Sequence, residues 1–386
     1  MKNKKLGDYV DIVSGYAFKS KEFDIKGVPV IRMSDLYQNK IRITANTARV
    51  VDINIDEKFL IQKGDILLGM SGSIGKMGIA DINGKMYLNQ RIAKIVPKNN
   101  EISRVFLIYL IRQICERMKQ DSVGGTVPNI SPNTLKNYDV WVPSIENQKE
   151  IANTLNLASK LIEKRKEQIA EMDKLIQSVF YEMFGDPVTN SKTWKKKKLS
   201  EMGIIARGKS KHRPRNAPEL LGGNYPLIQT GDVANSGIFI KEYKSTYSEL
   251  GLMQSKMWDR GTLCITIAAN IAKTGILSFD ACFPDSIVGM ICNENTNEIF
   301  MQVWFSFFQQ ILEKNAPESA QKNINLQILG GLEVICPPIK MQNKFASIVE
   351  EIESQKKAME ESLDEMENNF NALMQKSFRG ELFPEE

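Results

Sequence analysis

Two stretches of the chain carry apolar residues at the three- and four-residue steps of a helix that packs along one stripe. The first runs from Ile151 to Met183 with Arg165 as its interruption, and the second runs from Phe345 to Leu373 with Lys356 interrupting. An a/d pattern held for about five heptads is typical of a coiled coil. We therefore predict long helices over 145–184 and 339–386.

Both predicted helices are flanked by residues that are typical of helix ends. Pro143 and the Pro337-Pro338 pair stand just before the first turns, where proline is tolerated, and Gly185 and Gly380 follow the ends. The positions expected to pack one helix on the other share the a/d register: Ile151, Leu155, Ile162, Ile169, Met172, Ile176, Val349, Ile352, Met359, Leu363, Met366 and Phe370.

The two helical patterns are copies of each other, since each apolar position in the first has a partner 194 residues later. The same spacing relates residues 142–145 to 336–339 and Gln148 to Gln342, whereas residues 64–67 match 261–264 at a spacing of 197. A period of this length is far too long for a solenoid repeat. The sequence predicts a tandem duplication of a globular domain followed by a helix.

The globular copies are expected to mix α and β structure. Short strands are predicted at 28–31, 65–68 and 91–96, and helices at 106–111 and 300–312. Residues 190–198, which end in four lysines, are expected to form a solvated linker rather than a nucleic-acid patch. The prediction is an α+β fold in four parts: a globular domain over 1–144, a spacer helix over 145–184, a second globular domain over 185–338 and a C-terminal spacer helix over 339–386.

The formal net charge of +5 is spread unevenly over these four parts. Residues 1–144 carry +8 and residues 185–338 carry +3, whereas the two helical parts carry −1 and −5. A polyanion would be attracted to the two globular domains only. Charge alone leaves both nucleic-acid binding and a chance distribution of surface charge open.

Composition argues against several chemistries. The five cysteines never form a CxxC pair, which disfavours a disulfide framework or a zinc site and fits a reducing cytoplasm. A single histidine, His212, disfavours most metal and histidine-base mechanisms. No apolar run approaches the about 20 residues that span a bilayer, and the charged N-terminus is not expected to be a signal peptide. We therefore expect a cytoplasmic protein without a bound metal or membrane contact.

Two related domains, each followed by an equivalent helix, can pack with approximate two-fold symmetry, so that the helices run antiparallel as a coiled coil. A helix of about 36 residues is roughly 55 Å long, and dimeric DNA readers space their half-sites by about one helical turn or a multiple of it. Because the two globular copies differ strongly in sequence, they would read different half-sites. We expect a bipartite, asymmetric DNA target.

The first copy contains the motifs PVIRMSDL at 29–36, GDIL at 64–67, LNQR at 88–91 and VPSIENQKEIA at 142–152. The second copy contains PLIQTGDV at 226–233 and CPPI at 336–339. The duplicated order of these motifs resembles the specificity subunits of Type I restriction-modification enzymes, over essentially the whole chain. The second copy departs from the pattern at 283–286, where FPDS stands in place of the LNQ motif, and at Met341, where an acidic residue is usual.

The resemblance implies that the globular copies are target-recognition domains, similar to the DNA-reading domain of certain adenine methyltransferases. The repeated helices would separate them and dock two modification subunits, which bind S-adenosylmethionine and flip out the target adenine. Two motor-nuclease restriction subunits, which use ATP, would join for restriction. The chain itself would hold no cofactor and no catalytic residue.

Candidate DNA contacts in the first copy fall in three short segments. The 71–76 stretch does not have the spacing of a P-loop, so a loop that places Lys76 on phosphate is preferred, with a plain β-turn as the alternative. The polar residues near 32–34 could serve a turn, and those at 89–91 could satisfy backbone groups. The candidates are Arg32, Ser34, Ser71, Ser73, Lys76, Asn89, Gln90 and Arg91.

Candidate DNA contacts in the second copy include the cation-rich segment 209–215, whose prolines limit helix formation. Its Lys and Arg side chains can grip phosphate or pair bidentately with guanine, and the alternative is a solvated loop. The candidates are Lys209, Lys211, Arg213, Arg215, Gln229, Thr230, Asn270 and Lys273.

Motifs of the relevant enzymes are missing from the sequence. There is no Asn-Pro-Pro-Tyr or Asp-Pro-Pro-Tyr motif of an adenine methyltransferase, and no carboxylate cluster with a nearby lysine that indicates a nuclease. The sequence therefore predicts a non-catalytic DNA-binding subunit that directs methyltransferase and motor-nuclease partners to a split target. The alternatives are a coiled-coil scaffold with protein-binding domains and a stand-alone enzyme that uses the 71–76 loop.

Overall fold

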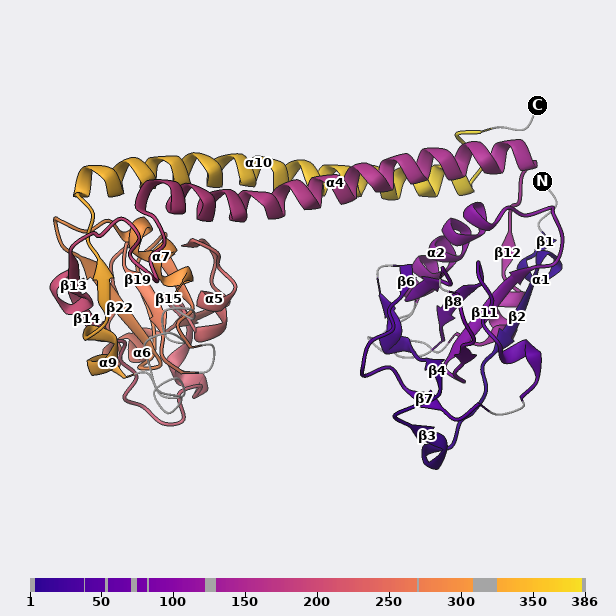
Figure 1. Ribbon diagram of the computed structural model, residues 1–386, viewed down its shortest axis with the longest axis horizontal. Helices are drawn as coiled ribbons and strands as arrows, with labels where there is room; N and C mark the ends of the chain where they lie inside the picture. Colours follow the sequence, from indigo (N-terminus) through magenta and orange to yellow (C-terminus); the bar gives the residue numbers. More distant parts are fainter. Residues whose placement is uncertain are drawn as a thin grey trace. The chain divides into compact units, whose positions relative to one another are not determined.

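A computed structural model describes residues 4–37, 39–52, 55–70, 75–81, 83–121, 130–268, 271–307 and 325–383. The chain divides into two compact units (Figure 1). Unit 1 comprises Met1–Lys164 and Ser362–Glu386, and unit 2 comprises Arg165–Glu361. Each unit contains half of each long helix, α4 (Ile145–Phe184) and α10 (Ile339–Phe378). The four parts predicted from the sequence are consecutive ranges of the chain. The two units instead group residues that pack together in space.

Unit 1 is built on a six-stranded sheet whose inner face is covered by α2 (Arg104–Gln120). A smaller four-stranded sheet and a two-stranded sheet complete it. In spatial order the six strands are β2 (Val10–Ser14), β11 (Ile92–Pro97), β8 (Ile66–Gly69), β9 (Met77–Ile79), β6 (Asn39–Ile41) and β5 (Leu36–Tyr37). The others are β10 (Tyr87–Leu88), β4 (Val28–Ile31), β7 (Arg49–Val50) and β3 (Phe23–Asp24), then β1 (Lys4–Lys5) with β12 (Asp139–Val140). The short helices are α1 (Leu6–Tyr9) and α3 (Pro132–Lys136).

Unit 2 repeats this plan with a five-stranded sheet and a smaller four-stranded sheet. In spatial order the five strands are β14 (Gly203–Arg207), β22 (Ile287–Cys292), β19 (Leu263–Thr266), β20 (Thr274–Leu277) and β16 (Phe239–Ile240). The others are β17 (Ser245–Tyr247), β15 (Leu221–Leu227), β21 (Ala281–Cys282) and β18 (Met257–Trp258), then β13 (Lys196–Lys198) with β23 (Glu333–Ile335). The helices are α5 (Thr230–Ala234), α6 (Glu249–Met253), α7 (Glu298–Ser306) and α9 (Leu326–Gly330).

The duplication extends to individual hydrogen bonds. Leu6 N–H donates to the carbonyl of Tyr138 at 2.9 Å, and Leu199 N–H donates to that of Leu332 at the same distance. The smaller sheet of each unit contains one parallel pair, β10 with β4 in unit 1 and β21 with β15 in unit 2. The predicted α+β fold with two repeated domains is therefore confirmed.

Two sequence predictions need correction. The predicted linker over 190–198 is wrong in its last part, because residues 196–198 form β13 and pair with β23. Strand pairing uses backbone groups, so a lysine run with exposed side chains fits a short edge strand and also blunts that edge. The predicted helix over 300–312 corresponds to α7, which ends at Ser306, and residues 308–312 lie outside the described part.

Within each unit the halves of α4 and α10 run antiparallel. In unit 2 the rings of Phe180 and Phe345 are 5.5 Å apart, and Lys356 Nζ lies 2.6 Å from an oxygen of Asp173, so the numbering rises along one helix as it falls along the other. Lys356, which interrupts the a/d pattern, thus pairs with the opposite helix. Of the twelve predicted packing positions, Ile151, Leu155, Ile176, Val349 and Ile352 are buried and the remaining seven are half-buried.

Each long helix is fixed to its own globular domain by a buried glutamine. Gln148 accepts from the backbone N–H of Ser103 at 2.8 Å and donates to the carbonyls of Glu101 and Pro143. Since Ser103 is the N-cap of α2, the glutamine joins the start of α4 to the start of α2. These hydrogen bonds set the direction in which the helix leaves the domain.

Unit 2 repeats this joint at a spacing of 194 residues. Gln342 accepts from the N–H of Asn297, the N-cap of α7, at 3.0 Å and donates to the carbonyls of Asn295 and Pro337. Both glutamines are fully buried. The end of the other long helix closes each joint, through Phe106–Phe378 ring packing in unit 1 and Phe300–Phe184 in unit 2.

Candidate nucleic-acid interface

In unit 1 two candidate segments follow neighbouring parallel strands. Ile31 at the end of β4 pairs with Leu88 at the end of β10. The carboxyl ends of parallel strands meet at one edge of a sheet, so residues 32–35 and 89–91 emerge side by side. The backbone N–H of Asn89 donates to the carbonyl of Ile31 at 3.3 Å, which ties the two segments together.

The hairpin between β8 and β9 brings the third segment to the same place. Lys76 Nζ donates to the carbonyl of Met33 at 3.4 Å, and Met70 N–H donates to the carbonyl of Arg91 at 3.0 Å. We call this gathering of residues 32–35, 76 and 89–91 the unit 1 edge. Ser71 and Ser73 lie outside the described residues.

The polar side chains of the unit 1 edge differ in their exposure. Ser34, Lys76, Gln90 and Arg91 are exposed. Arg32 is half-buried, and its buried Nε has no hydrogen-bond partner within the described residues. Asn89 is half-buried, and its side-chain oxygen accepts from the N–H of Arg91 at 3.3 Å, as in a turn.

The buried carboxylate of Asp35 holds the backbone of the unit 1 edge through hydrogen bonds. This carboxylate accepts from the backbone N–H of Arg32 at 2.8 Å and from the hydroxyl of Thr47 at 3.2 Å. In unit 2 the carboxylate of Asp232 accepts from the backbone N–H of Gln229, also at 2.8 Å. Each aspartate holds the loop that follows the longer parallel strand. The motif containing Asp therefore builds the platform, and its neighbours supply the exposed groups.

In unit 2 the segments after β15 and β21 form the equivalent platform, since Leu227 pairs in parallel with Cys282. Gln229 occupies the place of Arg32, and Thr230 occupies the place of Met33 rather than of Ser34, because the spacing here is 197. Gln229 is exposed and Thr230 is half-buried. The side chains at equivalent loop positions are therefore different in the two units.

The cation-rich segment 208–216 lies beside this platform. Gly208 N–H donates to the carbonyl of Ile287 at 2.8 Å, and Lys209 N–H donates to that of Phe283 at 3.1 Å. The backbone N–H of Lys211 donates to the side-chain oxygen of Gln254 at 2.6 Å. These bonds bring the predicted cations of 209–215 together with Gln229 and Thr230. We call residues 208–216, 229–230 and 284–286 the unit 2 edge.

The unit 2 edge contains a cavity of about 230 Å³. Its polar lining residues are Arg215, Asn216, Gln229, Thr230 and Ser286. Arg215 and Arg213 both form ion pairs with Asp285, which stands two positions after Phe283 in the loop that follows β21. Asp285 was not among the predicted site residues. The departure of residues 283–286 from the first copy was the signal that could have identified it.

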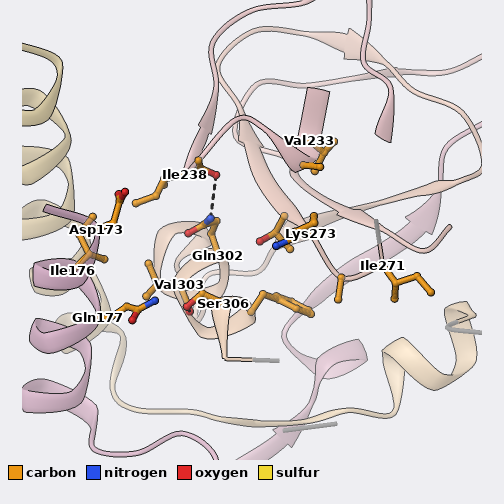
Figure 2. A pocket seen from close by; sticks show the side chains of 15 residues that line it. Asp173, Ile176, Gln177, Val233, Ile238, Ile271, Lys273, Gln302, Val303 and Ser306 are labelled. Atoms are coloured by element: carbon orange, nitrogen blue, oxygen red, sulfur yellow. Dashed lines mark hydrogen bonds between the residues drawn. The ribbon is translucent and has the colours of Figure 1, made fainter. Parts of the chain in front are cut away.

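Lys273 lies in a different setting from the other unit 2 candidates. It lines a cavity of about 410 Å³ between the hairpin β19–β20, α5, α7 and the last part of α4 (Figure 2). Gln302 lines the same cavity and donates to the carbonyl of Gly237 at 3.2 Å. In unit 1 the positions equivalent to Val303 and Ile176 are Tyr109 and Phe370, whose rings lie 6.3 Å apart. The side chains at these two positions are smaller in unit 2. Asn270 lies outside the described residues.

Burial raises the pKa of two cysteine thiols, Cys115 and Cys292, in each case to about 12. A protonated, buried thiol is a poor nucleophile. Throughout the described ranges no three His, Cys, Asp or Glu side chains gather as a metal-ligand set, and no helix combines the length and apolar character needed to cross a membrane.

A family model described as the Type I restriction modification DNA specificity domain matches residues 1–171 and again residues 191–368. The chain is 23% identical over 419 residues to the Type I restriction enzyme EcoBI specificity subunit of Escherichia coli, covering 98% of this chain and 85% of the relative. It is also 23% identical over 372 residues to the putative type I restriction enzyme MjaX specificity subunit of Methanocaldococcus jannaschii, covering 91% and 86%.

Two solved structures show the same fold. The S subunit of a Type-I restriction-modification system from M. genitalium has a TM-score of 0.52 at 16% identity, covering 98% of this chain and 96% of that one. A chain from a structure concerning complex assembly and conformational transition of the type I R-M system has a TM-score of 0.60 at 16% identity, covering 99% and 100%.

Proposed function

The chain belongs to the Type I restriction-modification specificity family, whose work is DNA target recognition, and we propose that it reads a bipartite, asymmetric target. Each unit would read one half-site through its own edge. The chain would act as a non-catalytic adaptor that directs an adenine methyltransferase and a motor nuclease to the DNA. Chemistry would take place on those partner subunits.

The observation that carries this proposal is that the two units have equivalent backbone platforms with different side chains on them. Equivalent strand ends, hairpins and aspartate-held loops recur in both units. On this platform Arg32, Gln90 and Arg91 of unit 1 correspond to Gln229, Asp285 and Ser286 of unit 2. Different donors and acceptors select different base edges, so the two half-sites would differ.

The proposal assigns the cofactors to partners. Two modification subunits would bind S-adenosylmethionine, and two restriction subunits would use ATP, while the chain itself would bind neither. Double-stranded DNA would contact the globular domains, which carry the positive charge of the chain. The free cysteines of the described structure fit the reducing cytoplasm, where we place the assembly.

The test is single-molecule sequencing of adenine methylation in cells that carry this gene with its partner methyltransferase, compared with cells from which this gene is deleted. We expect a split motif to be methylated only when the gene is present. Identical methylation in both strains would contradict the proposal. DNA binding by the assembled complex should also weaken steeply with salt, whereas a coiled-coil scaffold that binds only protein would show no such DNA binding.

A further inference from the structure

In the unit 2 edge Arg213 and Arg215 both pair with Asp285, but their other contacts differ. Arg213 donates to the carbonyls of Ser210 at 2.7 Å and His212 at 2.8 Å, and its Nη2 lies 3.6 Å from Asp285. Three groups thus hold Arg213, and it shapes the segment 208–216. Arg215 pairs with Asp285 through Nη2 alone, and no hydrogen bond to another described residue engages its Nε or Nη1.

Arg215 keeps donor groups available beside its ion pair with Asp285. Its side chain is 44% exposed and lines the cavity of about 230 Å³ with Gln229, Thr230 and Ser286. The Asp285 side chain is 35% exposed, so it is partly shielded from water where it forms the ion pair with Arg215. An arginine whose rotamer is already fixed loses less freedom when it binds a ligand.

The Arg215–Asp285 pair fits a base edge better than a phosphate. A carboxylate beside the guanidinium would repel a phosphate, whereas exposed Lys209 and Lys211 in the same segment have no ion pair within the described part of the chain. In the major groove, guanine offers two acceptors, N7 and O6, and its paired cytosine offers an amino donor beside them. An arginine only donates and a carboxylate only accepts. Side by side, they are therefore complementary to the two guanine acceptors and the adjacent cytosine donor.

We propose that Arg215, positioned by Asp285, reads a G·C base pair in the half-site recognised by unit 2. Arg215 donates to guanine N7 and O6, and Oδ2 of Asp285, which lies 3.6 Å from Arg213 Nη2 and can accept a further hydrogen bond, faces the cytosine amino group. This assignment rests on the proposed function and makes it specific to one base pair. Unit 1 has Gln90 at the place of Asp285 and would not make the same reading.

The experiment uses the full chain assembled with its methyltransferase subunits and a DNA library in which both half-sites are randomised. Methylated molecules are sequenced for the unmodified chain and for Arg215→Lys, Arg215→Ala and Asp285→Asn. We expect each variant to lose preference for guanine at one position of one half-site, by about ten- to a hundredfold, with the other half-site unchanged. Arg215→Lys keeps the charge and removes only the bidentate geometry, and Asp285→Asn is nearly isosteric.

Lys211→Ala is the matched control from the same segment. It should weaken binding to all sequences and lower the salt dependence without changing the motif, as expected for a phosphate contact. A motif whose guanine persists in Arg215→Lys and Arg215→Ala would overturn the assignment. If the unmodified complex selects no split motif at all, the proposed function itself fails, and the two failures are thereby distinguished.

Discussion

At the scale of single residues, equivalent hairpin turns of the two units are formed by different residue types. The hairpin β8–β9 of unit 1 has Gly75 at a φ of 84°, and the hairpin β19–β20 of unit 2 has Ala272 at a φ of 59°. Glycine adopts this left-handed conformation without a steric penalty, while a Cβ costs about 1–2 kcal/mol. Unit 2 therefore accepts backbone strain directly beside Lys273.

Gly75→Ala should lower the free energy of unfolding of unit 1 by about 1 kcal/mol, because the new Cβ is strained whatever the space around it. Ala272→Gly is the reciprocal change. It should raise the stability of unit 2 by about 0.5 kcal/mol, since the relief of strain is partly offset by greater freedom of the unfolded chain. Denaturant unfolding followed separately for each unit checks both. A gain of stability in Gly75→Ala would contradict this account.

At the scale of elements, one buried glutamine makes the hydrogen bonds that join each domain to its long helix. Gln342 satisfies the N-cap residue of α7 and two carbonyls that no apolar side chain could pair. Removing it would leave one buried and two part-buried polar groups without this partner, and an unpaired buried group costs about 1–3 kcal/mol. The aromatic packing of Phe300 and Phe184 would remain.

Gln342→Leu should therefore lower the free energy of unfolding of unit 2 by about 2 kcal/mol or more. The same change in Gln148 should destabilise unit 1 by a similar amount. The control is Gln375→Leu, an exposed glutamine on α10, which should alter stability little. Hydrogen exchange gives a direct readout, because the Asn297 amide should lose its protection. Unchanged exchange at that amide would show that the joint does not depend on Gln342.

At the scale of the whole molecule, the lengths of α4 and α10 are the property that the proposed function uses. Both helices have 40 residues, and the a/d positions are buried or half-buried along them. The chain passes from one compact unit to the other after Lys164 in α4 and after Glu361 in α10. An insertion of whole heptads at these two points preserves the a/d register.

One duplicated heptad inserted at both points should lengthen the spacer of the methylated motif by about three base pairs, since seven residues add roughly 10 Å of helix. The bases of the two half-sites should stay the same. Methylation-motif sequencing measures both properties. A four-residue insertion, which shifts the a/d register, is the control and should abolish methylation of the split motif. A heptad variant with an unchanged spacer would refute the role of the helices as a ruler.

The sequence by itself determined the repeated plan and the long helices. An a/d pattern that recurs at a spacing of 194 residues leaves little freedom, because apolar stripes of this length must be buried against one another. The parallel strand ends were also visible as short apolar runs followed by polar residues. These local patterns predicted β4 and the core of α2 well, and they placed most of the candidate contacts on the two edges.

Only the tertiary structure decided which polar groups act together. Asp35 and Asp232 belong to motifs whose polar residues could serve either DNA contact or a turn, and the structure shows each carboxylate holding the loop that follows a strand of the smaller sheet. Asp285 is 70 residues from Arg215, and nothing local indicates that they meet. The lysines of 196–198 form an edge strand because their partners arrive from β23, far along the chain. Pairings of this kind depend on loop closure and packing, which a local sequence pattern does not encode.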